Sequence, residues 1–154
     1  TAIRLGAKVT DLTLLELCYA PPFSSAKDPV NMVGFVAENV ITGKLKQFFW
    51  HDVENLPRDS SVTLLDTRTA TEVARGRIDG FMHIPLDSLR ERIDEIPKNK
   101  PVYVHCHSGL RSYIACRILT GYGFDCYNLA GGYRFYESVI NEKSVPEYIC
   151  TECK

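Results

Sequence analysis

Short apolar runs alternate with amphipathic segments over most of the chain after residue 46. Near-continuous apolar runs of about four residues are typical of strands buried in a sheet. Five runs have this character: Gln47–Trp50, Val62–Leu65, Met82–Ile84, Pro101–His105 and Cys126–Leu129. Because helical segments separate them, the pattern predicts an α/β fold with a mostly parallel five-stranded sheet flanked by helices.

Helical spacing also predicts which side of each helix is buried. Leu86, Leu89, Ile93 and Ile96 fall on one face of a helix that Pro97 ends. Another helix begins at Gly109 or Leu110 and ends at Gly121. Its predicted buried face consists of Leu110, Ile114, Ala115, Ile118 and Leu119. A short helix at 71–74 and a last one from the Gly131-Gly132 turn to about Ile140 complete the pattern.

The first 43 residues follow a different pattern. The run Leu12–Tyr19 resembles a short strand, and the adjacent prolines Pro21 and Pro22 predict a loop after it. Asp28 is a good N-cap, Pro29 suits the first helical position, and the helix should run to about Thr42, where Gly43 ends it. We therefore divide the chain into a front piece, 1–43, and a domain, 44–154.

Composition and charge narrow the class of protein. The 154 residues are 45% hydrophobic and 24% charged, which is ordinary for a globular domain with one core. The formal net charge is −1 and no run of Lys or Arg occurs, so we expect neither a nucleic-acid nor a membrane partner. No apolar stretch approaches the roughly 20 residues of a membrane span. We expect a cytoplasmic protein whose six cysteines are reduced.

The most informative segment is the loop from Cys106 to Arg111. A cysteine ends a predicted buried strand, and a helix begins within the next four residues. Amides at a helix N-terminus lack partners and attract anions, and Ser108 and Gly109 let the backbone turn tightly there. This surrounding favours the thiolate, so the loop predicts a nucleophile beside an anion site. The expected reaction is attack of Cys106 on a sulfane sulfur, which needs neither a metal nor an organic cofactor.

Several other side chains invite a chemical role that we do not assign. His105 should pack in its strand, and Asp66 and Arg68 should join a strand end to its loop by hydrogen bonds. Cys116 and Cys126 fall at apolar positions and should be core residues. Cys150 and Cys153 form a Cys-x-x-Cys whose options are zinc, a resolving dithiol or a tail without a role.

Residues from about Gln47 to Tyr136 resemble the rhodanese family. The matching segments are Leu64-Leu65-Asp66-Thr67-Arg68, Gly76-Arg77-Ile78-Asp79-Gly80, His83-Ile84-Pro85-Leu86, the Cys106 loop through Ser112, and Leu129-Ala130-Gly131-Gly132-Tyr133. Arg77 and His83 depart from the family pattern, and neither belongs to the nucleophile loop. The resemblance implies a three-layer α/β fold and sulfur transfer by Cys106, with Arg111 and the loop amides holding the anion.

The same resemblance implies a small-molecule donor and a thiol acceptor. Thiosulfate, a polysulfide or coenzyme A persulfide would donate the sulfur. The residues expected to shape the substrate site are His107, Ser108, Gly109, Leu110 and Ser112. Phosphatases with a related cradle use Cys-x5-Arg, whereas this loop is Cys-x4-Arg, so the loop length favours sulfur transfer. A rhodanese-fold interaction module without turnover remains an alternative, although such modules commonly lack the cysteine.

The front piece has a resemblance of its own. Leu17-Cys18-Tyr19-Ala20-Pro21-Pro22-Phe23-Ser24 and Ala26-Lys27-Asp28-Pro29-Val30-Asn31 resemble the end of the dimerisation domain in FAD-dependent coenzyme A-disulfide reductases. Some members of that family have a C-terminal rhodanese domain. The resemblance implies a parent oxidoreductase, plausible as a homodimer, that uses FAD and NAD(P)H. These residues contain no Gly-x-Gly-x-x-Gly after a strand, so neither cofactor is expected in this part.

Overall fold

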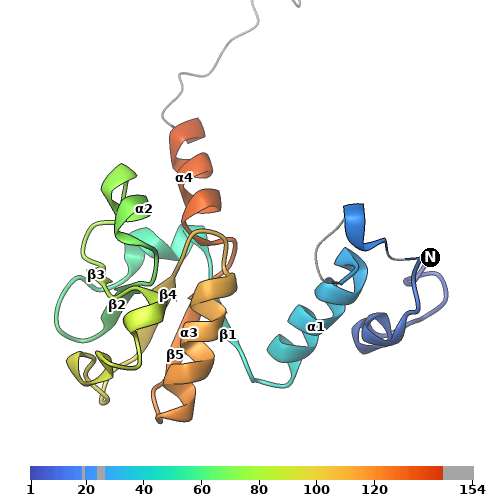
Figure 1. Ribbon diagram of the computed structural model, residues 1–154, viewed down its shortest axis with the longest axis horizontal. Helices are drawn as coiled ribbons and strands as arrows, with labels where there is room; N and C mark the ends of the chain where they lie inside the picture. The colour runs from blue at the N-terminus through green and yellow to red at the C-terminus, as the bar shows by residue number, and fades with distance from the viewer. Residues whose placement is uncertain (19, 24–26, 144–154) are drawn as a thin grey trace, which may run out of the picture. The chain divides into compact units, whose positions relative to one another are not determined.

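A computed structural model describes residues 1–18, 20–23 and 27–143 (Figure 1). The chain divides into two compact units, 1–46 and 47–154. The division falls at the end of the region 43–46, where the glycine after the predicted helix indicates a break. Each unit is described separately below.

The front unit is helical throughout its regular parts. It contains the 3-10 helix η1 (Val9–Leu14), the 3-10 turn η2 (Pro21–Phe23) and the helix α1 (Pro29–Ile41). The strand-like interpretation of Leu12–Tyr19 is wrong for its described residues. Local side-chain hydrogen bonds explain the tight turns, because Asp11 accepts from the Lys8 amide at 2.7 Å and Thr13 donates to the Thr10 carbonyl at 2.7 Å.

The helix α1 begins as its sequence predicts. Asp28 accepts a hydrogen bond from the Val30 amide at 2.8 Å, and Pro29 occupies the first turn. Gly34 then permits close packing on η1, because a Cβ there would lie 2.9 Å from the Thr13 nitrogen. Asn31 donates to the carbonyls of Leu12 and Leu15, so polar contacts as well as a missing side chain hold η1 on α1.

The second unit is built on a five-stranded sheet. The strands, in chain order, are β1 (Lys46–Phe48), β2 (Thr63–Asp66), β3 (Met82–His83), β4 (Val102–His105) and β5 (Cys126–Leu129). Their spatial order is β1-β5-β4-β2-β3. The pairs β2–β3, β2–β4 and β4–β5 are parallel. The predicted α/β fold with a mostly parallel five-stranded sheet is confirmed, and all five predicted strands occur.

Helices cover both faces of this sheet (Figure 1). They are the 3-10 helix η3 (Trp50–Asn55), α2 (Ala70–Arg75), α3 (Leu110–Gly121) and α4 (Gly132–Lys143). Two apolar clusters form the core: Leu65 joins the cluster that contains Leu119 of α3, whereas Leu64 joins the one that borders Tyr133 of α4. Adjacent residues of β2 thus face opposite layers. Among the described helices, none combines the length and apolarity needed to cross a bilayer.

Two details of the predicted helices are wrong. Instead of one helix over 86–96, the structure has two 3-10 turns, η4 (Leu86–Ser88) and η5 (Ile93–Glu95). Leu89, Ile93 and Ile96 are nevertheless buried as expected. The apolar spacing therefore identified the buried side of the segment, but it does not fix the number of residues per turn in a short piece between two prolines.

The buried face of α3 is also rotated from the predicted one. Leu110 and Ile114 are 61% and 39% exposed, whereas Ser112, which was not on the predicted face, is buried. Ala115 and Leu119 are buried as predicted. The reason is the contact that Ser112 makes with the Cys106 sulfur, described below, which turns a polar residue inward at the start of the helix.

A buried polar network joins the carboxyl ends of β2 and β4. Arg68 forms an ion pair with Asp66 at 2.7 Å and donates to the Gly76 carbonyl at 2.9 Å. Its guanidinium lies over the Tyr133 ring, 3.9 Å from the centroid. Both charged side chains are almost fully buried, so each requires the other. The predicted role of Asp66 and Arg68 in joining strand end to loop is confirmed.

His105 is packed inside the same region, as predicted. Its ring lies edge-on to Phe81, with centroids 4.8 Å apart, and its Nε2 is 3.5 Å from an Asp66 oxygen without a hydrogen bond. Burial lowers the pKa of His105 to about 4, against the opposing effect of the Asp66 charge. The folded protein therefore holds this histidine neutral at neutral pH.

This burial predicts a loss of stability in mild acid. An unfolded histidine binds a proton below its ordinary pKa of 6.5, whereas the folded one resists protonation down to about 4. The free energy of unfolding should therefore fall between pH 6.5 and pH 4, by about 3 kcal/mol from this group. Denaturant titrations across that range would measure it. His105→Gln should remove this part of the slope, whereas His51→Gln, at an exposed histidine, should leave it; equal slopes in wild type and His105→Gln would contradict the prediction.

Candidate active site

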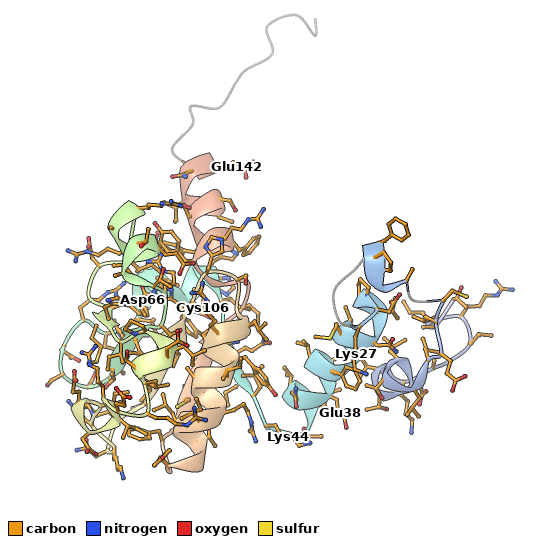
Figure 2. The ribbon with its side chains drawn as sticks, in the orientation of Figure 1. Lys27, Glu38, Lys44, Asp66, Cys106 and Glu142 are labelled. Carbon is orange, nitrogen blue, oxygen red and sulfur yellow. The ribbon has the colours of Figure 1, made fainter. Side chains whose placement is uncertain are left out.

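Cys106 lies where the central strand β4 ends and α3 is about to begin. It follows His105, the last residue of β4, and Figure 2 shows Cys106 and Asp66 inside the second unit. The turn into α3 is made at Gly109, which caps the helix in a left-handed conformation with φ of 103°. A glycine adopts this conformation without the steric cost that a side chain would add. The turn brings the first residues of α3 back over the cysteine.

Two groups donate hydrogen bonds to the Cys106 sulfur. The Gly109 amide nitrogen lies 3.1 Å from Sγ, and the Ser112 hydroxyl oxygen lies 3.3 Å from it. Cys106 and Ser112 are both fully buried. Donors that point at a sulfur stabilise its anionic form, because a thiolate accepts hydrogen bonds more strongly than a thiol. The structure therefore brings together three of the predicted site residues: Cys106, Gly109 and Ser112.

The remaining amides of the loop are open to an anion. Within the part of the chain that the structure describes, the amides of His107, Ser108, Leu110 and Arg111 have no hydrogen-bond acceptor. Unpaired amides at the start of a helix are the groups that bind anions in proteins. One loop amide, that of Gly109, is directed at the sulfur, and the binding of an anion by the other amides stays a prediction.

The carbonyls of the loop are held by α4. The Tyr133 amide donates to the Cys106 carbonyl at 2.8 Å, and the Arg134 amide donates to the His107 carbonyl at 2.9 Å. This approach requires Gly132, where a Cβ would lie 2.7 Å from the His107 oxygen and 2.8 Å from the Cys106 oxygen. Gly132, predicted as part of a turn, is therefore also the point where the active-site loop approaches the start of α4.

Arg111 is paired with an acidic residue of α2. Its guanidinium forms a bidentate ion pair with Glu72 of α2, at 2.7 and 2.6 Å, and makes no hydrogen bond to Cys106. Arg111 keeps the pKa of Glu72 far below its usual value. The pKa of Arg111 is itself raised, chiefly by the hydrogen bonds to Glu72, with a smaller contribution from negative charge at Cys106. Arg111 thus anchors the loop to α2 while remaining within electrostatic reach of the sulfur.

Comparison with protein families matches this arrangement. Residues 50–138 match the family described as the rhodanese-like domain. The chain belongs to the rhodanese-like domain family. The match covers every strand of the sheet from β2 to β5 and the whole Cys106 loop.

Similar proteins carry related names. A sulfurtransferase of Allochromatium vinosum is 39% identical over 80 residues, which are 51% of this chain and 75% of that protein. The thiosulfate sulfurtransferase GlpE of Pseudomonas syringae is 28% identical over 89 residues, which are 57% of this chain and 84% of that protein.

Two solved structures are similar over more of the chain. Reduced Bacillus anthracis CoADR-RHD has a TM-score of 0.85 and 42% identity, and the match covers 92% of this chain and 25% of that one. A NAD-dependent persulfide reductase from A. fulgidus has a TM-score of 0.72 and 38% identity, with 87% and 24% covered. The present chain thus spans about a quarter of each of these proteins.

The side chains of the rhodanese-like loop differ in exposure. Ser108 and Leu110 are exposed, with Leu110 at 61%, and His107 is half-buried. These three form the outer rim of the loop, where a substrate would meet them first. Ser112 is instead fully buried. It can affect the reaction through its contact with the Cys106 sulfur, and it does not face a substrate directly.

Sequence reasoning missed two residues of the site. Glu72 holds Arg111, and Asn128 of β5 donates to the Gly109 carbonyl at 3.3 Å. Each had a signal in the sequence. Thr69 and Glu72 form a capping box at the start of α2, and Asn128 is a polar residue in a strand that is otherwise buried and apolar.

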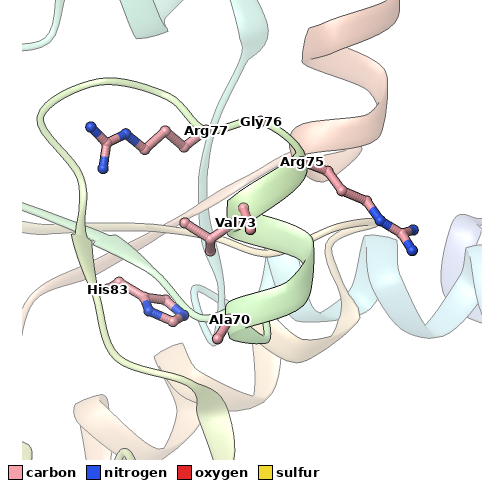
Figure 3. Close-up of a pocket in the computed structure, with 7 residues that line it drawn as sticks. Ala70, Val73, Arg75, Gly76, Arg77 and His83 are labelled. Carbon is pink, nitrogen blue, oxygen red and sulfur yellow. The ribbon is translucent and has the colours of Figure 1, made fainter.

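A pocket of about 500 Å³ opens beside α2 (Figure 3). The lining residues are Ala70, Val73, Ala74, Arg75, Gly76, Arg77 and His83. In the close-up, Ala70 and His83 approach each other across it, whereas the Arg75 side chain extends away from them. The lining includes no residue of the Cys106 loop, and it contains both positions, Arg77 and His83, at which the sequence departs from the family pattern.

The other cysteines are exposed, buried or outside the described residues, and Cys18 is the exposed one. Cys116 and Cys126 are core residues, as predicted. A hydrogen bond with Cys126, together with burial, raises the pKa of Cys116, so this thiol stays protonated. Cys150 and Cys153 lie outside the described residues. Among the described residues, no cluster of three or more His, Cys, Asp or Glu side chains could hold a metal ion.

The contact between Gly132 and the loop predicts a specific effect of an added methyl group. Gly132→Ala should displace the carbonyls of Cys106 and His107, because Ala is strained at φ of 64° and its Cβ would overlap both oxygens. We expect a loss of about 1–3 kcal/mol in the free energy of unfolding. Alkylation of Cys106, followed by mass spectrometry of its peptide, should change in rate by at least about tenfold as Sγ loses its aligned donors.

A matched control is available in the same fold. Gly121 ends α3 and has nothing within 4 Å of a Cβ, so Gly121→Ala should keep both stability and alkylation rate. Wild-type alkylation in Gly132→Ala would show that the loop does not depend on this contact.

Proposed function

We infer that this chain is a rhodanese-type sulfurtransferase that carries sulfur on Cys106 as a persulfide. The observation that carries the inference is the pair of donors, the Gly109 amide and the Ser112 hydroxyl, directed at Sγ at the start of α3. Membership in the rhodanese-like family and relatives named sulfurtransferases support it.

The proposed reaction has two displacements at sulfur. In the first, the Cys106 thiolate attacks the outer sulfur of a donor; a bond forms between Sγ and that sulfur, and the remainder of the donor leaves with the electron pair. With thiosulfate the leaving group is sulfite. In the second, the thiolate of an acceptor attacks the terminal sulfur of the persulfide, and the Cys106 thiolate departs with its electrons. Sulfur moves from donor to acceptor, and the protein is regenerated.

The loop provides the stabilisation that the intermediate needs. The added sulfur extends about 2 Å beyond Sγ and carries a negative charge. The unpaired amides can donate hydrogen bonds to this anionic sulfur, as the donors of an oxyanion hole do. They belong to His107, Ser108, Leu110 and Arg111. Arg111, although paired with Glu72, still responds to charge at Cys106 and adds to the positive potential. Cys106 is fully buried, so a donor needs a path to its sulfur. We propose that this path lies at the exposed rim of the loop.

The rim side chains do not select one donor over another by charge. These side chains, His107, Ser108 and Leu110, include no permanent charge, so they accommodate a small anion or a bulkier persulfide. Thiosulfate is supported by the relative named thiosulfate sulfurtransferase, and a persulfide or polysulfide by the structural neighbour named persulfide reductase. A low-molecular-weight or protein thiol would be the acceptor.

Sulfur uptake is directly measurable. Incubation with thiosulfate or coenzyme A persulfide, in separate reactions, should add one sulfur atom to the intact mass, and the sulfur should be on Cys106. Cys106→Ser should abolish the gain, because among the described cysteines Cys106 is the one beside the anion cradle. Cyanide or a thiol should then remove the added sulfur.

Matched variants separate the possible failures. Cys116→Ser removes a buried core thiol and should retain uptake. Sulfur found mainly on Cys150 or Cys153 would contradict the assignment to Cys106. If wild type gains no sulfur and Cys106 also resists iodoacetamide, the fold serves as an interaction module and the enzymatic proposal fails.

We propose secondly that the chain works within a larger flavin-dependent reductase of coenzyme A disulfide, persulfide or polysulfide. The match to CoADR-RHD covers 92% of the chain, well beyond residues 50–138, so it includes front-unit residues. In such a protein the present domain would deliver or receive the sulfur. FAD and NAD(P)H would be bound elsewhere, since these 154 residues contain no dinucleotide-binding fingerprint.

The front unit itself favours association with other protein. Neither η1 nor α1 has a buried apolar side chain. Several large apolar residues of this unit are strongly exposed, namely Leu14 (79%), Phe23 (90%), Val33 (59%) and Ile41 (67%). Clusters of exposed apolar side chains mark protein interfaces. A dimerisation domain completed by further chain, as the sequence resemblance implies, would cover them.

This second proposal is tested on the longer natural chain. If the gene encodes an upstream region, the full-length protein should purify with the visible absorption of a bound flavin, and NADH or NADPH should bleach it. Coenzyme A persulfide should then be reduced, and Cys106→Ser should affect sulfur delivery without releasing the flavin. A full-length protein without flavin would exclude the reductase while leaving the sulfurtransferase intact.

A further inference from the structure

Three donors compete for one carbonyl beside the nucleophile. The Gly109 carbonyl lies 3.0 Å from the Tyr113 amide, 3.3 Å from the Asn128 side-chain amide and 3.2 Å from the Ser112 hydroxyl. The Ser112 hydroxyl also lies 3.3 Å from the Cys106 sulfur. A hydroxyl has one hydrogen, so Ser112 donates to the carbonyl or to the sulfur, but not to both.

The count of lone pairs decides between these acceptors. A carbonyl oxygen has two lone pairs. The Tyr113 amide, in the first turn of α3, takes one of them. If the Asn128 amide takes the other, the Ser112 hydrogen has the sulfur as its remaining acceptor. Without Asn128, the nearer carbonyl oxygen would compete for that hydrogen, and Sγ would lose one of its two donors.

We propose that Asn128 is a positioning residue that reserves the Ser112 hydroxyl for the Cys106 sulfur. It acts through Ser112 and does not touch the reacting atom. Asn128 is 4% exposed and lies at the carboxyl end of β5, next to β4 in the sheet. Its Oδ1 has no hydrogen-bond partner among the described residues, so Nδ2 on the Gly109 carbonyl is its one polar contact there. A buried side-chain oxygen without a hydrogen-bond donor costs free energy. An asparagine at this position therefore needs a compensating role, and the hydrogen bond from its Nδ2 to the Gly109 carbonyl provides one.

The inference rests on the proposed function and makes it more specific. A donor on Sγ matters most while the charge is on Sγ, before sulfur arrives. Once the persulfide forms, the charge moves to the outer sulfur, and the Ser112 hydrogen can return to the carbonyl. Asn128 should therefore assist formation of the thiolate and the first displacement, rather than release of sulfur to the acceptor.

A double-mutant cycle on Cys106 reactivity tests this. The rate of iodoacetamide alkylation, resolved by mass spectrometry of the Cys106 peptide, is measured against pH for wild type, Asn128→Leu, Ser112→Ala and the double variant. Leu has nearly the shape of Asn and removes Nδ2 without adding a charge. We expect Asn128→Leu to slow alkylation of Cys106 by roughly tenfold at neutral pH, because Sγ loses one of its two donors.

The outcome in the double variant is decisive. If Asn128 acts through Ser112, the double variant should match Ser112→Ala, so that the two losses are not additive. Additive losses, or an unchanged alkylation rate in Asn128→Leu, would overturn the proposal. Asn128→Ala repeats the measurement with a cavity in place of an apolar side chain, and thermal unfolding shows whether each variant is folded. If neither Asn128 variant folds, Asn128 has a structural role and the proposal is rejected.

The failure of the proposed function would look different. Wild type would then gain no sulfur from thiosulfate or coenzyme A persulfide, whatever the Asn128 variants do. The alkylation cycle reports hydrogen bonding at Sγ and does not require turnover. With turnover present, Asn128→Leu should slow sulfur uptake about tenfold at neutral pH and leave the rate of sulfur release to a thiol nearly unchanged.

Discussion

The active site depends on which way the peptide groups of one loop point. Tyr133 and Arg134 of α4 take the carbonyls of Cys106 and His107, and Gly109 turns its amide to the sulfur. Because each peptide group has its amide and carbonyl on opposite sides, fixing the carbonyls also orients the amides. An anion site made of backbone therefore requires a neighbouring element that accepts this close approach, and Gly132 provides it.

Tyr133 connects that loop to the rest of the sheet. Its amide holds the Cys106 carbonyl, and its ring lies against the Arg68 guanidinium at the end of β2. Arg68 in turn is paired with Asp66. Tyr133 therefore contacts both the buried ion pair and the nucleophile loop. Glu72 of α2 adds a further contact to the loop through its ion pair with Arg111. The ion pairs of Arg68 and Arg111 thus position the loop. The hydrogen-bond donors on the sulfur itself are the Gly109 amide and the Ser112 hydroxyl.

The two units of the chain use apolar residues in different ways. In the second unit, side chains of the sheet and its helices fill two clusters, one on each face. In the front unit, the closest approach is made by Gly34 on η1, and large apolar side chains stay exposed. A unit that leaves such surface uncovered gains little from the hydrophobic effect on its own. This contrast is the physical basis of the proposal that the front unit belongs to a larger assembly.

The sequence alone was sufficient to locate the five strands and the candidate nucleophile along the chain. Buried strands are apolar at every position and helices repeat with a fixed period, so all five strands, α1 and the bounds of α3 were predictable. The same holds for Cys106 and for Asp28 as an N-cap, since each acts on residues near it in the chain. Local patterns report what local atoms do.

Only the tertiary structure decided what faces the sulfur. The pairing of Arg111 with Glu72 and the contact of Asn128 with Gly109 join residues 39 and 19 positions apart, and the rotation of α3 buries Ser112 rather than Leu110. Periodicity gives the spacing of a helix face but not its partner, and a charged residue near a nucleophile binds whichever opposite charge the fold brings closest. These choices depend on distances in space, which a pattern along the chain does not contain.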